Sequence, residues 1–224
     1  MFESIKLSDL PKGNCGILRE GSSTRPTIWV IEENGARAIV KDFGTNRFLF
    51  RNIFGRFLVW RESRAYKNLG NIEGIPTLHR VIGGLALVLE EIPGKALGEF
   101  KKGEGPSRTF FDAMESLVDR VHKQGLAHCD LKRASNTLLS HDGIPYIIDW
   151  GASISKRECR LFPLNLIYRR FILDDHMAIT KLKLRYAPET IPPEEIGRYR
   201  QRSQVEKTIR ALRDRLRGIL QKIA

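Results

Sequence analysis

The stretch HCDLKRASNTLL, residues 128–139, decides the fold that we expect for this chain. It places Asp130, Lys132 and Asn136 on one short polar segment between apolar ones. A simple turn needs only Asp or Asn, and a buried strand would not tolerate Lys132 and Arg133 between its apolar positions. The segment therefore predicts a loop that holds a carboxylate and an amide at a fixed separation, and such loops commonly serve chemistry.

Regular elements flank this loop. Between residues 107 and 124, apolar side chains recur at helical spacing and predict a buried helix that ends at Gly125. The residues that mark its buried face are Phe110, Phe111, Met114, Leu117, Val118 and Val121. After the loop, TLLS and PYIID predict two short strands joined by a turn at HDG.

The first part of the chain is rich in predicted strands. Residues 27–43 predict a hairpin whose turn, EENG at 32–35, gives Gly35 a left-handed backbone. Residues 81–92 predict either a second strand pair or one bent strand, with the turn at Gly83–Gly84.

Helices fill most of the rest. Apolar residues recur at helical spacing from Phe48 to Leu69, and we expect further helices at 160–173, 175–186 and 194–222. The last carries a heptad seam, for which we favour packing within the chain over dimerisation or membrane contact. That seam is Val205, Ile209, Leu212, Leu216, Ile219 and Ile223. The chain thus changes from sheet-rich to helix-rich near Pro93.

Composition limits the class of protein. The chain has 224 residues, a length that suits one domain or one two-lobed unit. Its hydrophobic content of 42% is enough for a core. Its formal charge of +12 favours an anionic partner, although a solvated basic surface is the simpler interpretation. The first twenty residues lack the apolar run of a signal peptide, and the longest uncharged stretch, 81–89, is too short to span a bilayer. We therefore expect a cytoplasmic protein, with contact at the inner membrane surface left open.

Neither the cysteines nor the histidines outside the loop show metal-ligand spacing. We interpret these histidines as structural and expect reduced thiols. The residues are Cys15, Cys129 and Cys159, and His79, His122, His141 and His176.

Five polar residues, on four segments of the chain, follow one another in a characteristic order. Lys41 ends the strand AIVK, Glu62 lies on the next helix, Asp130 and Asn136 share the loop, and Asp149 ends the strand PYIID. This order resembles the protein-kinase superfamily, in which a strand Lys, a helix Glu, a catalytic-loop Asp and Asn, and a metal-binding Asp follow in turn.

The resemblance covers most of residues 12–152 and implies an α+β, two-lobed, protein-kinase-like fold with a reduced helical C-lobe. We expect an N-lobe at 1–92 and a C-lobe at 93–224. YAPET, at 186–190, has the letters of a kinase motif, but too few residues follow it for the helical half of a standard protein kinase. A helix ended by Pro188 is the better interpretation.

The resemblance implies ATP and Mg²⁺ as cofactors. Lys41 would neutralise the phosphates and Glu62 would hold its ammonium group. Asn136 and Asp149 would supply the hard oxygen ligands that Mg²⁺ prefers. Asp130 would accept the proton of the attacking hydroxyl, a role worth ~10²–10⁴ in rate.

Further residues follow from the same resemblance. Lys132 would balance charge on the transferred phosphoryl group. LVLEEIPG is similar to the kinase segment that reads the adenine edge. There Glu90 would offer its carbonyl, Ile92 its amide and carbonyl, and Leu89 would lie behind the ring.

The phosphate loop departs from the family pattern. REGSSTRPT has only Gly21 where GxGxxG is expected. Ser22, Ser23 and Thr24 would still bind phosphate through backbone N–H groups and hydroxyls.

The catalytic loop also departs from that pattern. Asn136 lies six residues after the catalytic Asp instead of five, but thirteen before Asp149, as is usual in the kinases it resembles. We keep Asn136 as the metal ligand, with Ser135 as the alternative. Trp150 would fill the apolar socket of the family's Phe, and His128 would brace the loop from beneath.

The short C-terminal half is similar to RIO-type kinases. KDFGTNRFLFRNIFGRFLVWRESRAYKNLGNIEGIP, residues 41–76, more closely resembles lipopolysaccharide-core kinases of bacteria. The latter implies phosphorylation of a sugar hydroxyl on an envelope glycolipid. Because Lys132 is typical of Ser/Thr protein kinases, a RIO-like protein kinase is the first alternative. A non-catalytic module that binds nucleotide or membrane is the second.

Arginines alternate with aromatic residues in the segment 47–61. A basic aromatic helix can lie on an anionic membrane, which would allow peripheral contact. We favour the simpler interpretation, in which the apolar side packs on the sheet and the arginines are solvated. No nucleic-acid partner is expected, and the oligomeric state is left open.

Overall fold

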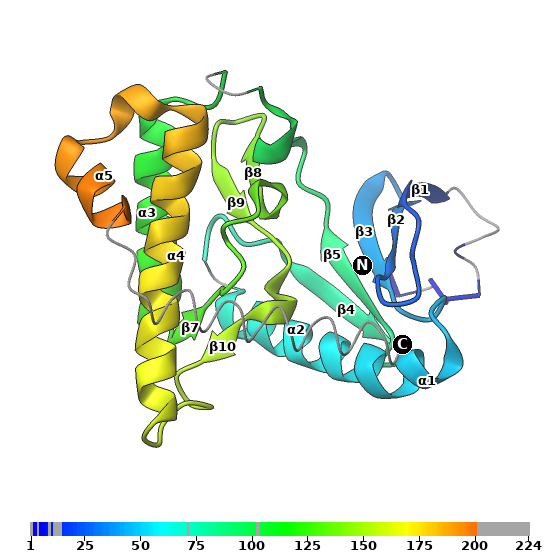
Figure 1. Ribbon diagram of the computed structural model, residues 1–224. Coiled ribbons are helices and arrows are strands. Elements are labelled where there is room, and N and C mark those ends of the chain that lie inside the picture. The colour runs from blue at the N-terminus through cyan, green and yellow to red at the C-terminus, as the bar shows by residue number, and fades with distance from the viewer. Residues whose placement is uncertain are drawn as a thin grey trace. The chain divides into compact units, whose positions relative to one another are not determined.

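The computed structural model (Figure 1) describes residues 2–3, 5–8, 10, 15–70, 72–101 and 104–200. The described residues form two compact units. The first unit contains the described residues within 2–63 and 78–91 together with Arg200, and the second contains those within 64–77 and 92–199.

The first unit is built on a five-stranded antiparallel sheet with strand order β1-β2-β3-β5-β4. Its strands are β1 (Cys15–Arg19), β2 (Thr27–Glu33), β3 (Ala36–Asp42), β4 (Leu78–Ile82) and β5 (Ala86–Glu90). The predicted hairpin at 27–43 is confirmed. Of the two alternatives for 81–92, the strand pair is the one observed, as β4 and β5. The β2–β3 turn narrows to Asn34 and Gly35, whose φ angles of 54° and 77° match the two left-handed positions of a tight hairpin.

One face of this sheet carries the core of the first unit. Trp29, Val40 and Val88 lie on neighbouring strands and pack in one buried cluster. Successive residues of a strand point to opposite faces, so Lys41 projects from the other face. The strand pairing places Lys41 between Ile28 on β2 and Leu87 on β5, in the middle of the sheet.

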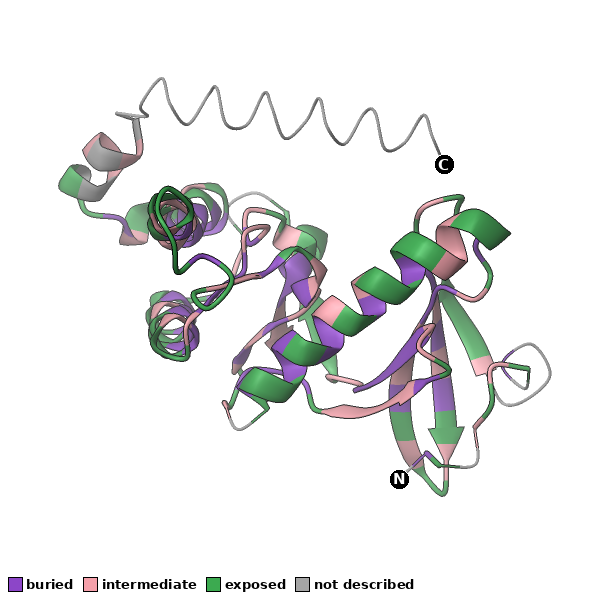
Figure 2. Cartoon of the chain, turned by 90° about the horizontal axis from the view of Figure 1, so that it is seen from below, coloured by how far each residue is buried: buried purple, intermediate pink, exposed green. Residues whose placement is uncertain are grey.

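The predicted helix from Phe48 to Leu69 is present but not uniform. It consists of α1 (Phe48–Phe50), a π-helical turn η1 (Arg51–Gly55) and α2 (Arg56–Leu69). Figure 2 shows that α2 has one buried and one exposed face. Our simpler interpretation of 47–61 was wrong, because six large apolar side chains there are exposed instead of packed on the sheet. They are Phe48 (71% exposed), Leu49, Ile53, Phe54, Phe57 and Trp60.

The second unit contains two small sheets. Strands β6 (Gly94–Ala96), β8 (Thr137–Ser140) and β9 (Pro145–Ile147) form one, and β7 (Leu126–Ala127) pairs with β10 (Ile154–Ser155) in the other. The predicted strands on both sides of the HDG turn are confirmed as β8 and β9. Short 3-10 helices connect these elements: η2 (Leu97–Glu99), η3 (Ala134–Asn136), η4 (Trp150–Ala152) and η5 (Pro188–Thr190).

Two long helices, α3 (Arg108–Lys123) and α4 (Leu164–Tyr186), pack side by side in the second unit (Figure 1). The α3 prediction is confirmed, since all six residues of its apolar face are buried and Gly125 follows with φ 80°. Our prediction of separate helices at 160–173 and 175–186 was wrong, because α4 is one continuous helix. Leu164–Tyr186 contains no Pro or Gly, and the Asp175 carboxylate binds another segment of the chain, so it does not cap a new helix.

The chain after α4 is described only in part. The helix ends at Tyr186, before Pro188, as expected, and α5 (Pro193–Arg200) covers the start of the last predicted helix. The heptad seam lies outside the described residues. Along the part of the chain that the structure describes, no helix has the length and apolar character needed to cross a membrane.

Gly74 gives a test of the packing in the second unit. A Cβ at this position, where φ is +96°, would lie 2.6 Å from Leu117 Cδ2 and 2.7 Å from the Pro145 carbonyl oxygen. Gly74→Ala should therefore lower the free energy of unfolding by ~2–5 kcal/mol, through overpacking and backbone strain. At Gly143 φ is +80° but a Cβ would meet nothing within 4 Å, so Gly143→Ala should cost only ~1–2 kcal/mol. Urea denaturation measures both, and equal losses would contradict the packing described here.

Candidate active site

Lys41 and Glu62 form a buried ion pair within the first unit. Lys41 Nζ donates to both carboxylate oxygens of Glu62, at 2.9 and 2.8 Å. The side chains are only 11% and 1% exposed, so the charges are shielded from water. Such a pair persists only with good geometry, and the two-oxygen contact with the α2 carboxylate provides it. The ammonium group is thereby fixed over the middle of the sheet.

The loop between β1 and β2 contains the residues at which we expect phosphate to bind, Gly21, Ser22, Ser23 and Thr24. Gly21, Ser22 and Ser23 are exposed, and Thr24 is half-buried. The Ser22 N–H donates to the Arg25 carbonyl at 3.1 Å, so this N–H is used within the loop itself. The buried Asn46 side chain donates to the carbonyls of Ser22 and Arg25 and holds the turn closed. Asn46 is a positioning residue that the sequence interpretation missed.

The segment predicted to read an adenine follows β5. Glu90 is the last residue of that strand and pairs with Ala38 of β3, and Leu89 before it is buried. Ile92 lies beyond the strand and is half-buried. Arg37 and Glu91 form an ion pair at 2.8 Å beside this strand end.

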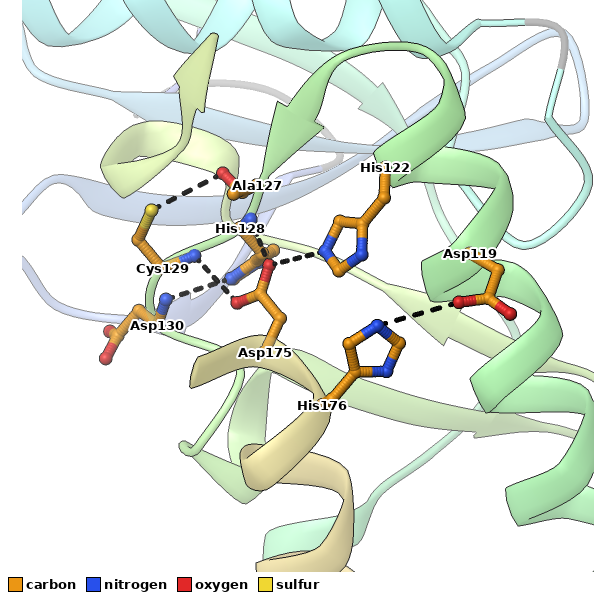
Figure 3. A network of polar contacts seen from close by, with 8 residues as sticks. All are labelled: Asp119, His122, Ala127, His128, Cys129, Asp130, Asp175 and His176. Atoms are coloured by element: carbon orange, nitrogen blue, oxygen red, sulfur yellow. Dashed lines mark hydrogen bonds and ion pairs between the residues drawn. The ribbon is translucent and has the colours of Figure 1, made fainter. Parts of the chain in front are cut away.

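A carboxylate from α4 holds the start of the loop that contains Asp130 in the second unit (Figure 3). Asp175 accepts the His128 N–H at 2.7 Å on one oxygen and the Cys129 N–H at 3.0 Å on the other. Cys129 has a φ of 67°, a left-handed backbone that costs ~1–2 kcal/mol in a residue with a side chain. The two hydrogen bonds to a buried carboxylate stabilise this conformation, and the loop turns sharply into Asp130.

His128 braces the loop, as we expected. Its ring is buried, its Nδ1 accepts the Asp130 N–H at 3.3 Å, and its Nε2 lies 3.0 Å from the Ile148 carbonyl. The acceptor at Nδ1 leaves the proton on Nε2, which donates to that carbonyl. Trp150 is fully buried and its ring centroid lies 4.6 Å from that of His128, so it fills an apolar position beneath the loop.

The Asp130 carboxylate pairs with Arg133, the residue after Lys132. Arg133 Nε lies 2.9 Å from Asp130 Oδ2, and both side chains are partly exposed. We had assigned the charge-balancing role to Lys132, which is half-buried in the same turn. The geometry thus adds Arg133 to the charged groups around Asp130.

Asn136 and Asp149 lie on adjacent backbone segments. The Ile148 N–H donates to the Asn136 carbonyl at 2.9 Å. The Asn136 Nδ2 donates to the Asp130 carbonyl at 3.1 Å, so its Oδ1 faces away from that contact. Ser135, the alternative ligand, has its hydroxyl 3.4 Å from this Oδ1. Asp149 has a left-handed backbone, with φ 66° and ψ 64°, at the start of η4.

The sequence interpretation gave Asp175 no role, although a signal for it exists. Ala178, Ile179 and Leu182 mark the buried face of α4, and Asp175 extends the same spacing. A carboxylate on a buried helix face needs hydrogen-bond donors from elsewhere in the fold. The identity of those donors, the His128 and Cys129 N–H groups, could come only from the structure.

Sequence comparison gives a distant relative. No protein-family model matches the chain. The CBL-interacting serine/threonine-protein kinase 21 of Arabidopsis thaliana is 35% identical over 102 residues, which is 42% of this chain and 24% of that protein. The chain therefore spans about a quarter of the length of this curated relative.

Structural comparison gives the fold. The Rio2 kinase from Chaetomium thermophilum aligns with a TM-score of 0.58 and 17% identity, over 80% of this chain and 59% of that one. Its ADP/Mg²⁺-phosphoaspartate complex aligns with a TM-score of 0.55 and 18% identity, over 79% of this chain and 57% of that one. The chain therefore has a protein-kinase-like fold with a reduced helical lobe, similar to that of these two Rio2 kinase structures.

Proposed function

We propose that the chain is an ATP-dependent phosphotransferase that moves the γ-phosphate to a hydroxyl group. The observation that carries this proposal is the loop that presents Asp130. Its backbone is held by hydrogen bonds to three side chains, those of Asp175, His128 and Asn136. A loop held this firmly suits a catalytic group that must be positioned before the acceptor arrives. A module that only binds would gain little from it, and this favours the enzyme over the non-catalytic alternative.

The proposed chemistry gives each of the expected site residues one role. Lys41, held by Glu62, would contact the phosphates of ATP, and Glu90 and Ile92 would bind the adenine through their backbone groups. Asp130 would accept the proton of the acceptor hydroxyl while that oxygen bonds to the γ-phosphorus. The bond from the γ-phosphorus to the bridging oxygen breaks, and ADP leaves. Lys132 and Arg133 lie in the same loop and would balance the negative charge.

The donor set of the second unit suits Mg²⁺. Asn136 Oδ1 and the Asp149 carboxylate are hard oxygen donors, and the Ile148–Asn136 hydrogen bond ties their backbones together. These two residues would hold the ion, with the Ser135 hydroxyl as the alternative donor. When bound, Mg²⁺ would neutralise phosphate charge. The left-handed backbone of Asp149 is the kind of strained geometry that concentrates at functional sites.

Replacing the proposed base tests the enzyme directly. Asp130→Asn should lower kcat for ATP-dependent phosphorylation by ~10²–10⁴, because the amide cannot accept the hydroxyl proton. The matched control is Asp142→Asn, which changes an exposed Asp in the turn between β8 and β9 and should leave kcat unchanged. Steady-state turnover with Mg²⁺–ATP, on proteins of equal thermal stability, makes the comparison. Equal turnover in Asp130→Asn and the unaltered chain would end the proposal.

We further propose a glycolipid sugar, such as one in a lipopolysaccharide core, as the acceptor. A set of exposed apolar residues and neighbouring arginines, which we call the aromatic–arginine patch, supports a glycolipid acceptor. They are Phe48, Leu49, Ile53, Phe54, Phe57 and Trp60, with Arg47, Arg51, Arg56 and Arg61. Exposed apolar side chains on one helical segment, interleaved with arginines, suit the surface of an anionic membrane. An enzyme bound there would meet its acceptor at that surface.

The acceptor is identified by transfer of label from γ-labelled ATP. With purified core glycolipid and a generic Ser/Thr protein substrate offered together, we expect label in the glycolipid and little in the protein. Asp130→Asn serves as the blank. Label in protein alone would favour the RIO-like protein-kinase alternative and remove the glycolipid proposal.

The patch has its own test with phosphatidylglycerol-containing vesicles. Replacing Phe57 and Trp60 together by Ser should weaken vesicle binding at least ~fivefold, because two exposed aromatic groups no longer enter the interface. The control is Leu173→Ser on α4, since Leu173 is as exposed (54%) but precedes two Asp residues. Co-sedimentation measures both variants. Equal binding of the double variant and the unaltered chain would exclude the patch as a membrane contact.

A further inference from the structure

Three ligand-type side chains that the proposed reaction does not use converge between α3 and α4 (Figure 3). Asp119 and His122 are three residues apart on α3 and so share a helix face, and His176 comes from α4. One ligand atom from each residue lies within 4.8 Å of the other two. His176 Nε2 and Asp119 Oδ1 are 3.7 Å apart, and the two imidazole centroids are 5.1 Å apart. The helix packing creates this cluster, which is why sequence spacing gave no sign of it.

The geometry points to a binding site for a transition metal, Zn²⁺ in particular, formed by Asp119, His122 and His176. Tetrahedral Zn²⁺ with bonds of ~2.0–2.2 Å requires ligand atoms ~3.4 Å apart. The 3.7 Å pair is close to that value, and the ligand atom of the third residue lies within 4.8 Å of the other two. Two imidazoles and one carboxylate suit Zn²⁺ better than Mg²⁺ or Ca²⁺, which prefer oxygen ligands alone.

His122 is already oriented as a zinc ligand should be. Its Nε2 lies 3.1 Å from Asp175 Oδ2, and a carboxylate that accepts hydrogen bonds leaves the proton on Nε2. The Nδ1 lone pair is then available for a metal. A carboxylate that fixes the second nitrogen of a histidine ligand is a recurrent feature of zinc sites.

The exposure of the side chains also fits the proposed zinc site. The Asp119 and His176 side chains are 57% and 42% exposed, which leaves a path for the ion and room for a water ligand. His122 is largely buried, at 10% exposed, so one ligand is rigid while two can adjust. The site differs in residues and in ligand chemistry from the oxygen donors Asn136 and Asp149.

Zn²⁺ binding to the full chain tests the inference. Equilibrium dialysis with excess Mg²⁺ present should give about one Zn²⁺ per chain. His176→Gln and Asp119→Asn should each weaken binding at least ~10-fold, since losing even a residue that only orients a ligand costs about that much. Both side chains are partly exposed, so neither change should prevent folding. Zn²⁺ should also raise the melting temperature of the unaltered chain more than that of His176→Gln.

Two control variants locate the ion. His141→Gln removes an exposed histidine in a turn and should leave Zn²⁺ affinity unchanged. Asp149→Asn alters the proposed Mg²⁺ site and should also bind Zn²⁺ normally, so failure of the kinase proposal does not affect this test. The inference fails if the unaltered chain binds no Zn²⁺, or if His176→Gln and Asp119→Asn bind it as tightly as the unaltered chain. An equal loss in Asp149→Asn or His141→Gln would place the ion elsewhere and overturn it too.

Discussion

The second unit depends on one buried carboxylate. Asp175 accepts two consecutive backbone N–H groups, those of His128 and Cys129, and a third contact from the His122 ring. An unpaired carboxylate at this depth would be costly, so α4 and the loop stabilise each other. The loop contributes its donors, and the helix contributes the acceptor that keeps a left-handed Cys129 in place. Asp130 is aimed by this contact although it takes no direct part in it.

Much of the fold could be predicted because local patterns were strong. The α3 face, with residues such as Phe111 and Leu117, follows helical spacing with full burial. The hairpin around Gly35 has a turn that demands positive φ. The ordered series Lys41, Glu62, Asp130 and Asn136 indicated the fold class, and the Lys41–Glu62 pair forms within one unit. In each case the signal lay in neighbouring residues or in the order of motifs along the chain.

The features that could not be predicted arise from contacts distant in sequence. We expected one helix to end at residue 173 and another to begin at 175, but Asp175 binds a loop almost fifty residues earlier, and α4 continues through it. His122 and His176 meet only because α3 and α4 pack together. Helical periodicity around Phe57 and Trp60 did not show whether their side of the helix meets the sheet. In the structure both side chains are exposed. Periodicity identifies a face, whereas its partner is decided by tertiary packing.

The left-handed backbone at Cys129 and Asp149 affects how the second unit unfolds. Each conformation is uphill by ~1–2 kcal/mol and persists only while its surroundings hold it. At Cys129 the restraint is the hydrogen bond from its N–H to Asp175 on α4. Local unfolding of α4 around Asp175 would therefore allow Cys129 to leave the left-handed conformation. Loss of the loop conformation and loss of helix order would then be a single event. Heating should disorder the loop and the helix in one cooperative step, leaving no population in which only one of them is folded.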